Sequence, residues 1–338
     1  MVSRPWDTGA VTQRRISLIT LGGTISSEAT RATSGVVPVS GADLFRQEVE
    51  HWVPGIALLP HELRLVPSPS LTLDDLLALH RYVLALPDDV EGVVVSQGTD
   101  TIEETAFALD LLGTASARPV VVTGAMRSRA AAGEDGPANL VSAVLVAASA
   151  EARRAGVLVQ FADLVHSARW VSKRSTFHVD AFTSEPLGPL GYVAEGEARL
   201  ELRPRPRPVL TAPESARARV ALVSTGAGDD LALLPGLADA GYDGVVLAGV
   251  GAGHVAASAV ENVAATAARI PVLMASRTGA GPVFERTYGY PGGEIDLRDR
   301  GVMTAGQLSP VKARVLLALL LSSGTEGDGL REAVARHS

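Results

Sequence analysis

Hydroxyl, carboxylate and amine side chains recur just after predicted strands, and these groups together can carry out acyl transfer. Thr24 stands in LGGTIS, after a first β-branched run, and Thr99 with Asp100 stands in SQGTDT, after a second. Lys173 follows later and is one of only two lysines among 30 basic residues. Two threonines, an acid and an amine, in a chain without cysteine, favour chemistry in which a threonine hydroxyl is the nucleophile.

Each motif also has a purely structural interpretation. The stretch TDT, ending at Thr101, can cap a helix that begins near Ile102, because Asp and Thr are good N-cap residues and early acids suit the helix dipole. The two glycines of LGGTIS can form an ordinary tight turn. Lys173 can be a solvated surface charge. The occurrence of all these groups at one predicted sheet edge favours the chemical interpretation.

The scarcity of lysine draws attention to Lys173 and Lys312. All the other basic residues are arginine, which a GC-biased genome explains without any function. Lysine differs from arginine because its amine can lose a proton inside a protein. Each lysine is therefore a candidate for a role that arginine cannot fill.

Short β-branched strands separated by helices must position these side chains. Strands are expected to begin at Ile16, Gly92, Pro119 and Gly156, with helices over 73–86, 102–112 and 138–154. Uninterrupted apolar strands between helices predict a parallel sheet covered on both faces. In open parallel sheets, ligands bind beyond the carboxyl ends of the strands, where the threonine motifs stand.

A second, smaller set of elements follows a stretch rich in Arg and Pro. That stretch, residues 203–218, predicts an extended linker. Beyond it, strands are expected from Arg219, Gly244 and Pro271, with helices over 230–240 and 255–268 and another beginning near Ser309. We therefore expect an α/β protein of two doubly wound domains with mostly parallel sheets, the larger over 1–202 and the smaller over 219–338.

Composition excludes several classes of protein and site. The chain has 338 residues, of which 46% are hydrophobic and 20% charged, as in ordinary globular proteins. A net charge of −7 argues against a nucleic-acid partner. The lack of cysteine excludes thiolate metal sites, and the seven histidines show no ligand-like spacing. Without an apolar segment long enough for a secretory signal or a membrane span, a cytoplasmic protein with no membrane partner is expected.

The glycine-rich motif GVGAGH, which ends at His254, resembles half of a dinucleotide-binding fingerprint. The third glycine is missing at the usual spacing, so this match is weak. We expect no cofactor and no metal.

Taken together, the motifs resemble those of the bacterial-type L-asparaginases, in the asparaginase/glutaminase family. The resemblance runs from Ile16 nearly to the C-terminus and includes LGGTIS, QGTDTIEETAFALDLL, RPVVVTGAMR, DGPANL, VSKRSTF, AGYDGVVLAGVGAGH and LSPVKARVLL. GGTI and GTDT, in this order and about seventy-five residues apart, are a specific combination. The resemblance implies hydrolysis of the small molecule L-asparagine to L-aspartate and ammonia, through a covalent acyl-threonine intermediate.

The resemblance also implies roles for single residues. Thr24 is expected to be the nucleophile, and Thr99, Asp100 and Lys173 are expected to form a second catalytic cluster. Asp100 is also expected to bind the α-ammonium group of the substrate. A hydroxyl that helps hold the α-carboxylate corresponds to Ser68.

Members of this family complete each site with the smaller domain of a neighbouring subunit. Glu294 corresponds to the acid that reaches across, and His254 stands where other members often carry an asparagine. A homo-oligomer is therefore expected, as a tetramer built from two dimers.

Two positions depart from the family pattern. The segment Ile25–Ser40 corresponds to the mobile lid, in which many relatives place a proton-relaying tyrosine, and here that position falls near Ser34. We hypothesise that Tyr288 or Tyr290 supplies the missing phenol from the adjacent subunit. A glutamine that is common after the carboxylate-binding serine is replaced by Pro69.

Three alternatives to asparagine hydrolysis stay open at this stage. The enzyme could prefer glutamine or another ω-amide. It could be a subunit of a tRNA-dependent amidotransferase, although such subunits usually have an extra N-terminal domain and only about fifteen residues precede the first strand here. It could also be a non-catalytic amino-acid sensor, which the presence of all four catalytic candidates argues against.

Overall fold

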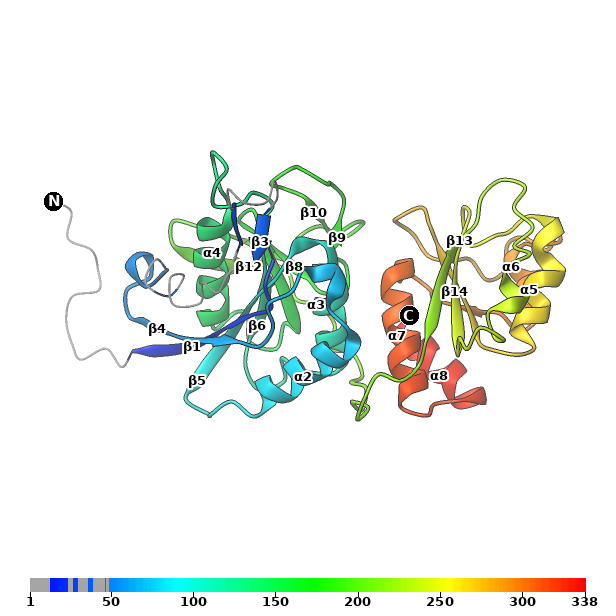
Figure 1. The fold of residues 1–338 in the computed structure, drawn as a ribbon, viewed down its shortest axis with the longest axis horizontal. Helices are drawn as coiled ribbons and strands as arrows, with labels where there is room; N and C mark the ends of the chain where they lie inside the picture. The colour runs from blue at the N-terminus through cyan, green and yellow to red at the C-terminus, as the bar shows by residue number, and fades with distance from the viewer. Residues whose placement is uncertain (1–12, 24–26, 30–35, 39–45, 47–48) are drawn as a thin grey trace.

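The computed structural model describes residues 13–23, 27–29, 36–38, 46 and 49–338. Within these residues the chain forms a larger and a smaller body (Figure 1). Residues 201–219, which connect the two bodies, form neither helix nor strand. Each body is built around its own sheet, so the α/β fold with two mostly parallel sheets is confirmed.

Eight strands form the first sheet in the described part of the chain, in the order β12-β11-β8-β7-β6-β5-β1-β4. Its parallel strands are β1 (Arg14–Thr20), β4 (Ile56–Glu62), β5 (Val90–Ser96), β6 (Val120–Thr123) and β7 (Val157–Phe161). Antiparallel pairs extend it through β8 (Leu164–Ser167), β11 (Gly191–Ala194) and β12 (Glu197–Leu200). Because β1 lies between β4 and β5, the strand order reverses beside β1, which is where doubly wound sheets bind ligands.

Alternating side chains of the parallel strands fill two cores, one on each face of the first sheet. Val94 packs in the core beneath α4 (Gly136–Ala148), whereas Val93 and Val95 pack in the core beneath α2 (Leu73–Leu84) and α3 (Ile102–Leu111). Successive side chains of a strand point to opposite faces of the sheet. Because the residues on both faces are apolar here, the strand is buried on both sides.

The second sheet is parallel throughout its described strands, in the order β13-β14-β15-β16. Its strands are β13 (Val220–Ser224), β14 (Gly244–Gly249), β15 (Val272–Ser276) and β16 (Met303–Thr304). One face is covered by α7 (Pro310–Ser322) and α8 (Gly327–His337), and the other by α5 (Val260–Ala267) and α6 (Glu294–Asp299) (Figure 1).

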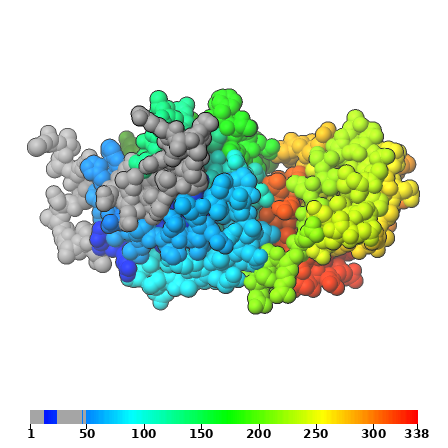
Figure 2. Space-filling model, viewed as in Figure 1, coloured from blue at the N-terminus to red at the C-terminus, as the bar shows by residue number. Residues whose placement is uncertain are grey.

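A single hydrophobic core, which we call the junction core, joins the two bodies. Leu76 of α2 and Phe107 of α3 belong to the same buried cluster as Leu316 of α7 and Val246 of β14. Figure 1 shows α7 on the side of the second sheet that faces α3, and Figure 2 shows orange residues of this region at the surface between the bodies. The second body is therefore fixed against α2 and α3.

Two small antiparallel pairs complete the described strands. β9 (Ser172–Lys173) pairs with β10 (Phe182–Thr183), and β2 (Ser27–Ala29) pairs with β3 (Val36–Pro38). None of the helices in the described part of the chain combines the length and apolar character needed to cross a membrane.

Most expected elements are present, with strand starts within two residues of the predicted ones, but the helix over 230–240 is wrong. That stretch contains only a short 3-10 turn, η4 (Leu234–Gly236). Its Leu-Pro-Gly sequence explains the difference, because proline lacks a backbone donor and glycine is a poor helix former.

Two further helices are shorter than predicted. α4 ends at Ala148 and not at 154, and Arg154 has a φ of +65°, which an α-helix cannot accommodate. α5 begins only at Val260, after a 3-10 turn, η5 (Ala257–Ala259).

Candidate active site

The turn after β1 packs directly on the backbone that follows β5. Gly22 and Gly23 have φ values of +98° and +93°, in the left-handed region that favours glycine. A Cβ atom on Gly23 would lie 2.1 Å from the backbone nitrogen of Gly98. The two glycines therefore allow a close backbone approach at the edge where the strand order reverses. Thr24 lies outside the described residues, as does most of the segment Ile25–Ser40.

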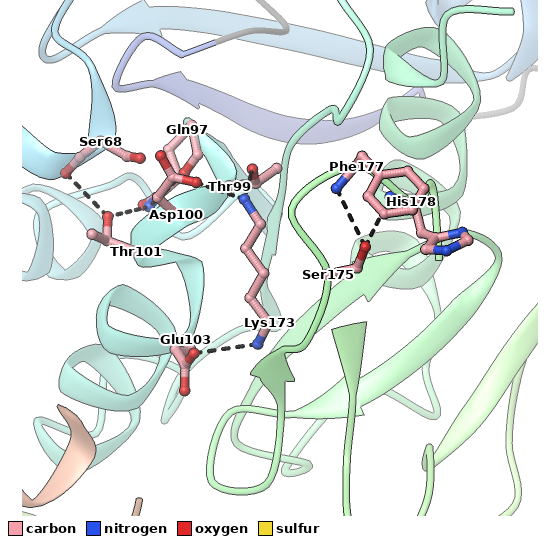
Figure 3. Close-up of polar contacts among 11 residues, drawn as sticks. Ser68, Gln97, Thr99, Asp100, Thr101, Glu103, Lys173, Ser175, Phe177 and His178 are labelled. Carbon is pink, nitrogen blue, oxygen red and sulfur yellow. Dashed lines mark hydrogen bonds and ion pairs between the residues drawn. The ribbon is translucent and has the colours of Figure 1, made fainter. Parts of the chain in front are cut away.

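Thr99 and Asp100 begin a 3-10 turn, η3 (Thr99–Thr101), that leads straight into α3. Thr99 is buried, whereas the Asp100 side chain is 62% exposed. The amine Nζ of Lys173 donates hydrogen bonds to Oγ1 of Thr99 at 2.8 Å and to Oδ1 of Asp100 at 2.6 Å (Figure 3). A hydroxyl, a carboxylate and an amine therefore form one cluster at the carboxyl end of β5.

The structure rejects the two plain interpretations of this cluster. Thr101 is the N-cap residue of α3, but its side chain makes no capping hydrogen bond. Its Oγ1 instead donates to the backbone oxygen of Ser68 at 3.1 Å. The Lys173 side chain is only 15% exposed, so Lys173 is not a solvated surface charge.

Glu103 fixes the strand that carries Lys173. Its Oε1 accepts a hydrogen bond from the backbone N–H of Lys173 at 3.2 Å (Figure 3), and its Oε2 accepts one from the Ser172 hydroxyl at 3.1 Å. The carboxylate thus ties β9 to the first turn of α3. Sequence reasoning missed this role, because an acid in the first turn of a helix is expected there for the dipole alone.

Ser68 lies beside the same turn, in a 3-10 turn, η2 (Ser68–Ser70), that comes after β4. Ser68 is buried, and a Cβ atom on Gly98 would lie 2.8 Å from its Oγ. Thr101 links the two turns through its hydrogen bond to Ser68, and the buried amide of Gln97 supports Thr101, since Nε2 of Gln97 donates to Oγ1 of Thr101 at 3.2 Å. Gln97 is a second positioning residue that sequence reasoning missed.

A second polar cluster lies in the smaller body, around the start of α6. Glu294 is 1% exposed and its Oε1 accepts hydrogen bonds from the backbone N–H groups of Thr287 and Tyr288, both at 2.7 Å. Its Oε2 lies 3.0 Å from Nε2 of His254, whose Nδ1 lies 2.8 Å from the hydroxyl of Tyr290. Tyr290, His254 and Glu294 therefore form a continuous hydrogen-bonded row.

The surroundings of Glu294 favour its charged form. Burial by itself raises the pKa of this carboxyl, but hydrogen bonds from the backbone of Tyr288 and Thr287 and from His254 outweigh burial and hold the pKa below its usual value. Tyr288 and Tyr290 are 41% and 48% exposed, so the aromatic end of the row faces solvent in this chain.

The two polar clusters are separate within one chain. Among the described residues, no hydrogen bond or ion pair joins Thr99, Asp100 or Lys173 to the row that ends at Glu294. The glycine-rich loop before His254 closes on itself, since Val250 and His254 exchange backbone hydrogen bonds of 3.0 and 2.9 Å. This loop does not open a helix directly, as a dinucleotide fingerprint requires.

Comparison with known protein families covers nearly the whole chain. Residues 15–206 match the family model described as "Asparaginase, N-terminal", and residues 219–334 match the "Glutaminase/Asparaginase C-terminal domain". The chain belongs to the asparaginase family. The two matched segments coincide with the two bodies of the fold, and the first contains the Thr99–Lys173 cluster while the second contains the His254–Glu294 row.

Several relatives of this asparaginase-family chain resemble it over most of its length. It is 36% identical over 321 residues to a protein of Deinococcus radiodurans named "Probable L-asparaginase", which covers 94% of this chain and 96% of the relative. It is 36% identical over 252 residues to "L-asparaginase 2" of Escherichia coli, covering 72% of this chain and 70% of the relative. It is 31% identical over 329 residues to the "Glutaminase-asparaginase" of Pseudomonas fluorescens, covering 94% and 88%.

Proposed function

We propose that this asparaginase-family protein hydrolyses L-asparagine to L-aspartate and ammonia through a covalent acyl-threonine intermediate. The observation that carries the proposal is the position of the Lys173 amine, which is hydrogen-bonded to the hydroxyl of Thr99 and to the carboxylate of Asp100. This cluster lies at the edge of the first sheet where the turn through Gly23 leads into Thr24. Relatives that match nearly the full chain are named as L-asparaginases, which supports the same substrate.

In the first step, the hydroxyl of Thr24 attacks the side-chain amide carbon of asparagine. The oxygen of the amide becomes an oxyanion, which the backbone N–H groups of the glycine turns are suited to stabilise, and losing one such donor typically costs about 3 kcal/mol. The C–N bond then breaks, the nitrogen takes up the threonine proton and leaves as ammonia, and Thr24 holds an aspartyl ester.

In the second step, water attacks the ester carbon, and the bond to Thr24 breaks to release aspartate. Thr99 prepares this water, because its hydroxyl can take a proton from the water and pass its own proton to the Lys173 amine 2.8 Å away when that amine is in its neutral form. Asp100 holds that amine in place from the other side at 2.6 Å. The proton finally returns to Thr24, so the catalyst is regenerated without a cofactor.

Substrate recognition uses groups at the same edge. The exposed carboxylate of Asp100 binds the α-ammonium group of the substrate, and the hydroxyl of Ser68, next to Gly98, helps to hold the α-carboxylate. Pro69 offers no side-chain donor after Ser68. The ratio of asparagine to glutamine turnover therefore needs a direct measurement, and the relative named "Glutaminase-asparaginase" makes glutamine the alternative substrate to compare.

The first test is steady-state ammonia release with asparagine and glutamine side by side. We expect release from asparagine by the wild-type chain and a loss of about 10⁴-fold or more in Thr24→Ala, because the nucleophile is removed. Thr211→Ala, the same change in the segment that connects the two bodies, is the matched control and should keep full activity.

Three outcomes of this test contradict the proposal in different ways. Activity that persists in Thr24→Ala rejects the acyl-threonine intermediate. Faster turnover of glutamine than of asparagine establishes the ω-amide alternative. A wild-type chain that binds asparagine and releases no ammonia is a sensor and not an enzyme.

We further propose that the row formed by Tyr290, His254 and Glu294 acts in the site of a neighbouring subunit. Glu294 is buried and anchored by backbone N–H groups, whereas Tyr288 and Tyr290 are exposed and can reach a second copy of the chain. The phenol of Tyr290, hydrogen-bonded to His254, is the better candidate to relay the proton of the nucleophile. The family's lid tyrosine position falls near Ser34, outside the described residues.

Tyr290→Phe tests this relay. We expect kcat to fall about a hundredfold, as for the loss of a general acid or base, and Tyr192→Phe on β11 to leave it unchanged. Mixing Thr24→Ala subunits with Tyr290→Phe subunits should restore activity, because some sites then combine an intact threonine with an intact phenol. If phenylalanine at both 288 and 290 leaves turnover intact, or mixing restores nothing, the relay hypothesis is wrong.

The same proposal covers domain roles, assembly and location. Residues 1–202 form the catalytic domain, 203–218 the linker, and 219–338 the domain that serves the neighbouring site. The assembly is a homotetramer of two dimers in the cytoplasm, and light scattering on the purified protein measures its mass directly. One relative is named "Probable L-asparaginase periplasmic", so cell fractionation is the corresponding test of location.

A further inference from the structure

Lys312, the second of the two lysines, is buried at the junction of the two bodies. It belongs to the first turn of α7 and is 1% exposed. Its Nζ donates hydrogen bonds to the backbone oxygen of Arg169 at 2.8 Å and to that of Val171 at 2.5 Å. The same amine lies 5.9 Å from the centre of the Phe107 ring. A buried amine on the smaller body thus binds two backbone groups of the larger one.

The two carbonyl groups precede the strand that carries Lys173. Val171 is followed directly by β9, whose two residues are Ser172 and Lys173. A displacement of the backbone at 169–171 therefore moves the origin of the Lys173 side chain. The Lys173 amine lies 2.8 Å from the hydroxyl oxygen of Thr99. This hydrogen bond would weaken if a shift of the β9 backbone lengthened that distance or changed its angle.

The segment from Arg169 to Lys173 is held on several sides. Lys312 binds its carbonyl oxygens, while Glu103 of α3 binds the backbone N–H of Lys173. The Arg169 side chain donates to the backbone oxygen of His337, at the end of α8, at 2.7 Å. Contacts from α7, α8 and α3 together fix this segment, and the Nζ atom of Lys312 is the hydrogen-bond partner of the carbonyl oxygens of Arg169 and Val171.

The chemistry of a lysine suits this position. Burial lowers the pKa of Lys312 to about 7, although the nearby Glu103 carboxylate opposes the shift. A neutral amine still carries two N–H bonds, which equals the number of carbonyl groups it serves. An arginine would keep its full charge in this buried place and would bring a larger, planar group with five donors.

We propose that Lys312 is a positioning residue that holds the β9 backbone, and with it Lys173, in register with Thr99 and Asp100. The inference rests on the proposed function for its effect on catalysis, whereas the effect on Lys173 itself is independent of the substrate. The smaller body thereby contributes to the site of its own chain, through the backbone of the larger one.

The direct readout is the chemical reactivity of the Lys173 amine. In Lys312→Met, Lys173 is the only lysine in the chain, so acetylation by acetic anhydride is assigned to it by mass spectrometry without ambiguity. We expect the acetylation rate of Lys173 to rise about tenfold in this variant. The reason is that the amine would lose its charge-assisted hydrogen bond to Asp100, and the loss of one such bond changes the population of free amine by about that factor. Lys312→Arg, which keeps donors for the carbonyls, should show a smaller rise and guards against misfolding of the methionine variant.

The matched control is Val315→Ala, on the same helix and in the same junction core. It removes buried apolar contacts but no hydrogen bond to residues 169–173, so it should lower the melting temperature and leave Lys173 reactivity unchanged. For asparagine hydrolysis, we expect Lys312→Met to lower kcat about thirtyfold with KM within about threefold, since Lys173 acts on the chemical step.

The outcomes separate this inference from the proposed function. If Lys173 is no more reactive in either Lys312 variant than in Val315→Ala, or if kcat falls equally in all three, Lys312 is merely structural and the inference is wrong. If the wild-type chain releases no ammonia from asparagine, the proposed function fails, and the reactivity measurement still decides the role of Lys312.

Discussion

Lys173→Arg is expected to lower kcat for asparagine hydrolysis about a thousandfold while leaving the fold intact, in line with the loss of a general acid–base group. The Lys173 amine donates to Thr99 at 2.8 Å and to Asp100 at 2.6 Å, and arginine can keep a charged contact with the carboxylate. Arginine cannot release its proton, however, so a proton can no longer move through the cluster. Steady-state kinetics at saturating asparagine measure the loss.

A companion variant separates proton transfer from fixed charge. Lys173→Met removes both the charge and the proton and should lose at least as much activity as Lys173→Arg. Circular dichroism and melting temperature verify that both variants are folded. Should Lys173→Arg keep more than about a tenth of wild-type kcat, the amine is a fixed charge that holds Asp100, and the proton path through Thr99 must be abandoned.

Gly23→Ala is expected to lower the free energy of unfolding by about 3 kcal/mol, through the strained backbone and the steric clash together. Gly23 has a φ of +93°, and its added Cβ atom would lie 2.1 Å from the backbone nitrogen of Gly98. Backbone cannot rotate away as a side chain can, so the turn after β1 must separate from the turn after β5. Urea unfolding measures the change.

Gly55→Ala is the matched control for this effect. Gly55 has a similar φ of +88°, but no heavy atom lies within 4 Å of the Cβ atom it would receive. It should lose only about 1 kcal/mol, which is the conformational strain alone. Asparaginase activity should also fall in Gly23→Ala and not in Gly55→Ala. Equal destabilisation of the two variants would show that close packing at Gly23 is unimportant.

Local sequence patterns predicted the central strands and helices well, because burial on both faces leaves a strong signal. The run of valines in β5 followed by a polar knot and a helix is one example, and its start differs from the prediction by two residues. The four-residue strands β8, β11 and β12 carry too few residues to reveal a period. The false helix over 230–240 has a different cause, because Pro235 and Gly236 interrupt that stretch and leave only the short turn η4.

The candidate site was predictable in its chemical groups but not in its supports. Thr99, Asp100 and Lys173 have side chains whose reactivity is visible in the sequence, and scarcity marked both lysines. The supporting contacts of Glu103 and Lys312 join positions 70 and 143 residues apart in the chain, and only the tertiary fold brings them together. Spacing rules do not extend to such distances.

The junction core limits how freely the second domain can be exchanged between family members. A chimaera that keeps residues up to about 206 and takes its second segment from another member must rebuild the buried surface between Phe107 and Leu316. A poor fit there would shift α7, and with it the Lys312 amine beneath Arg169. Swapping the second half of this protein would therefore alter the chemistry of the first half, even though every reactive group of the first half were retained.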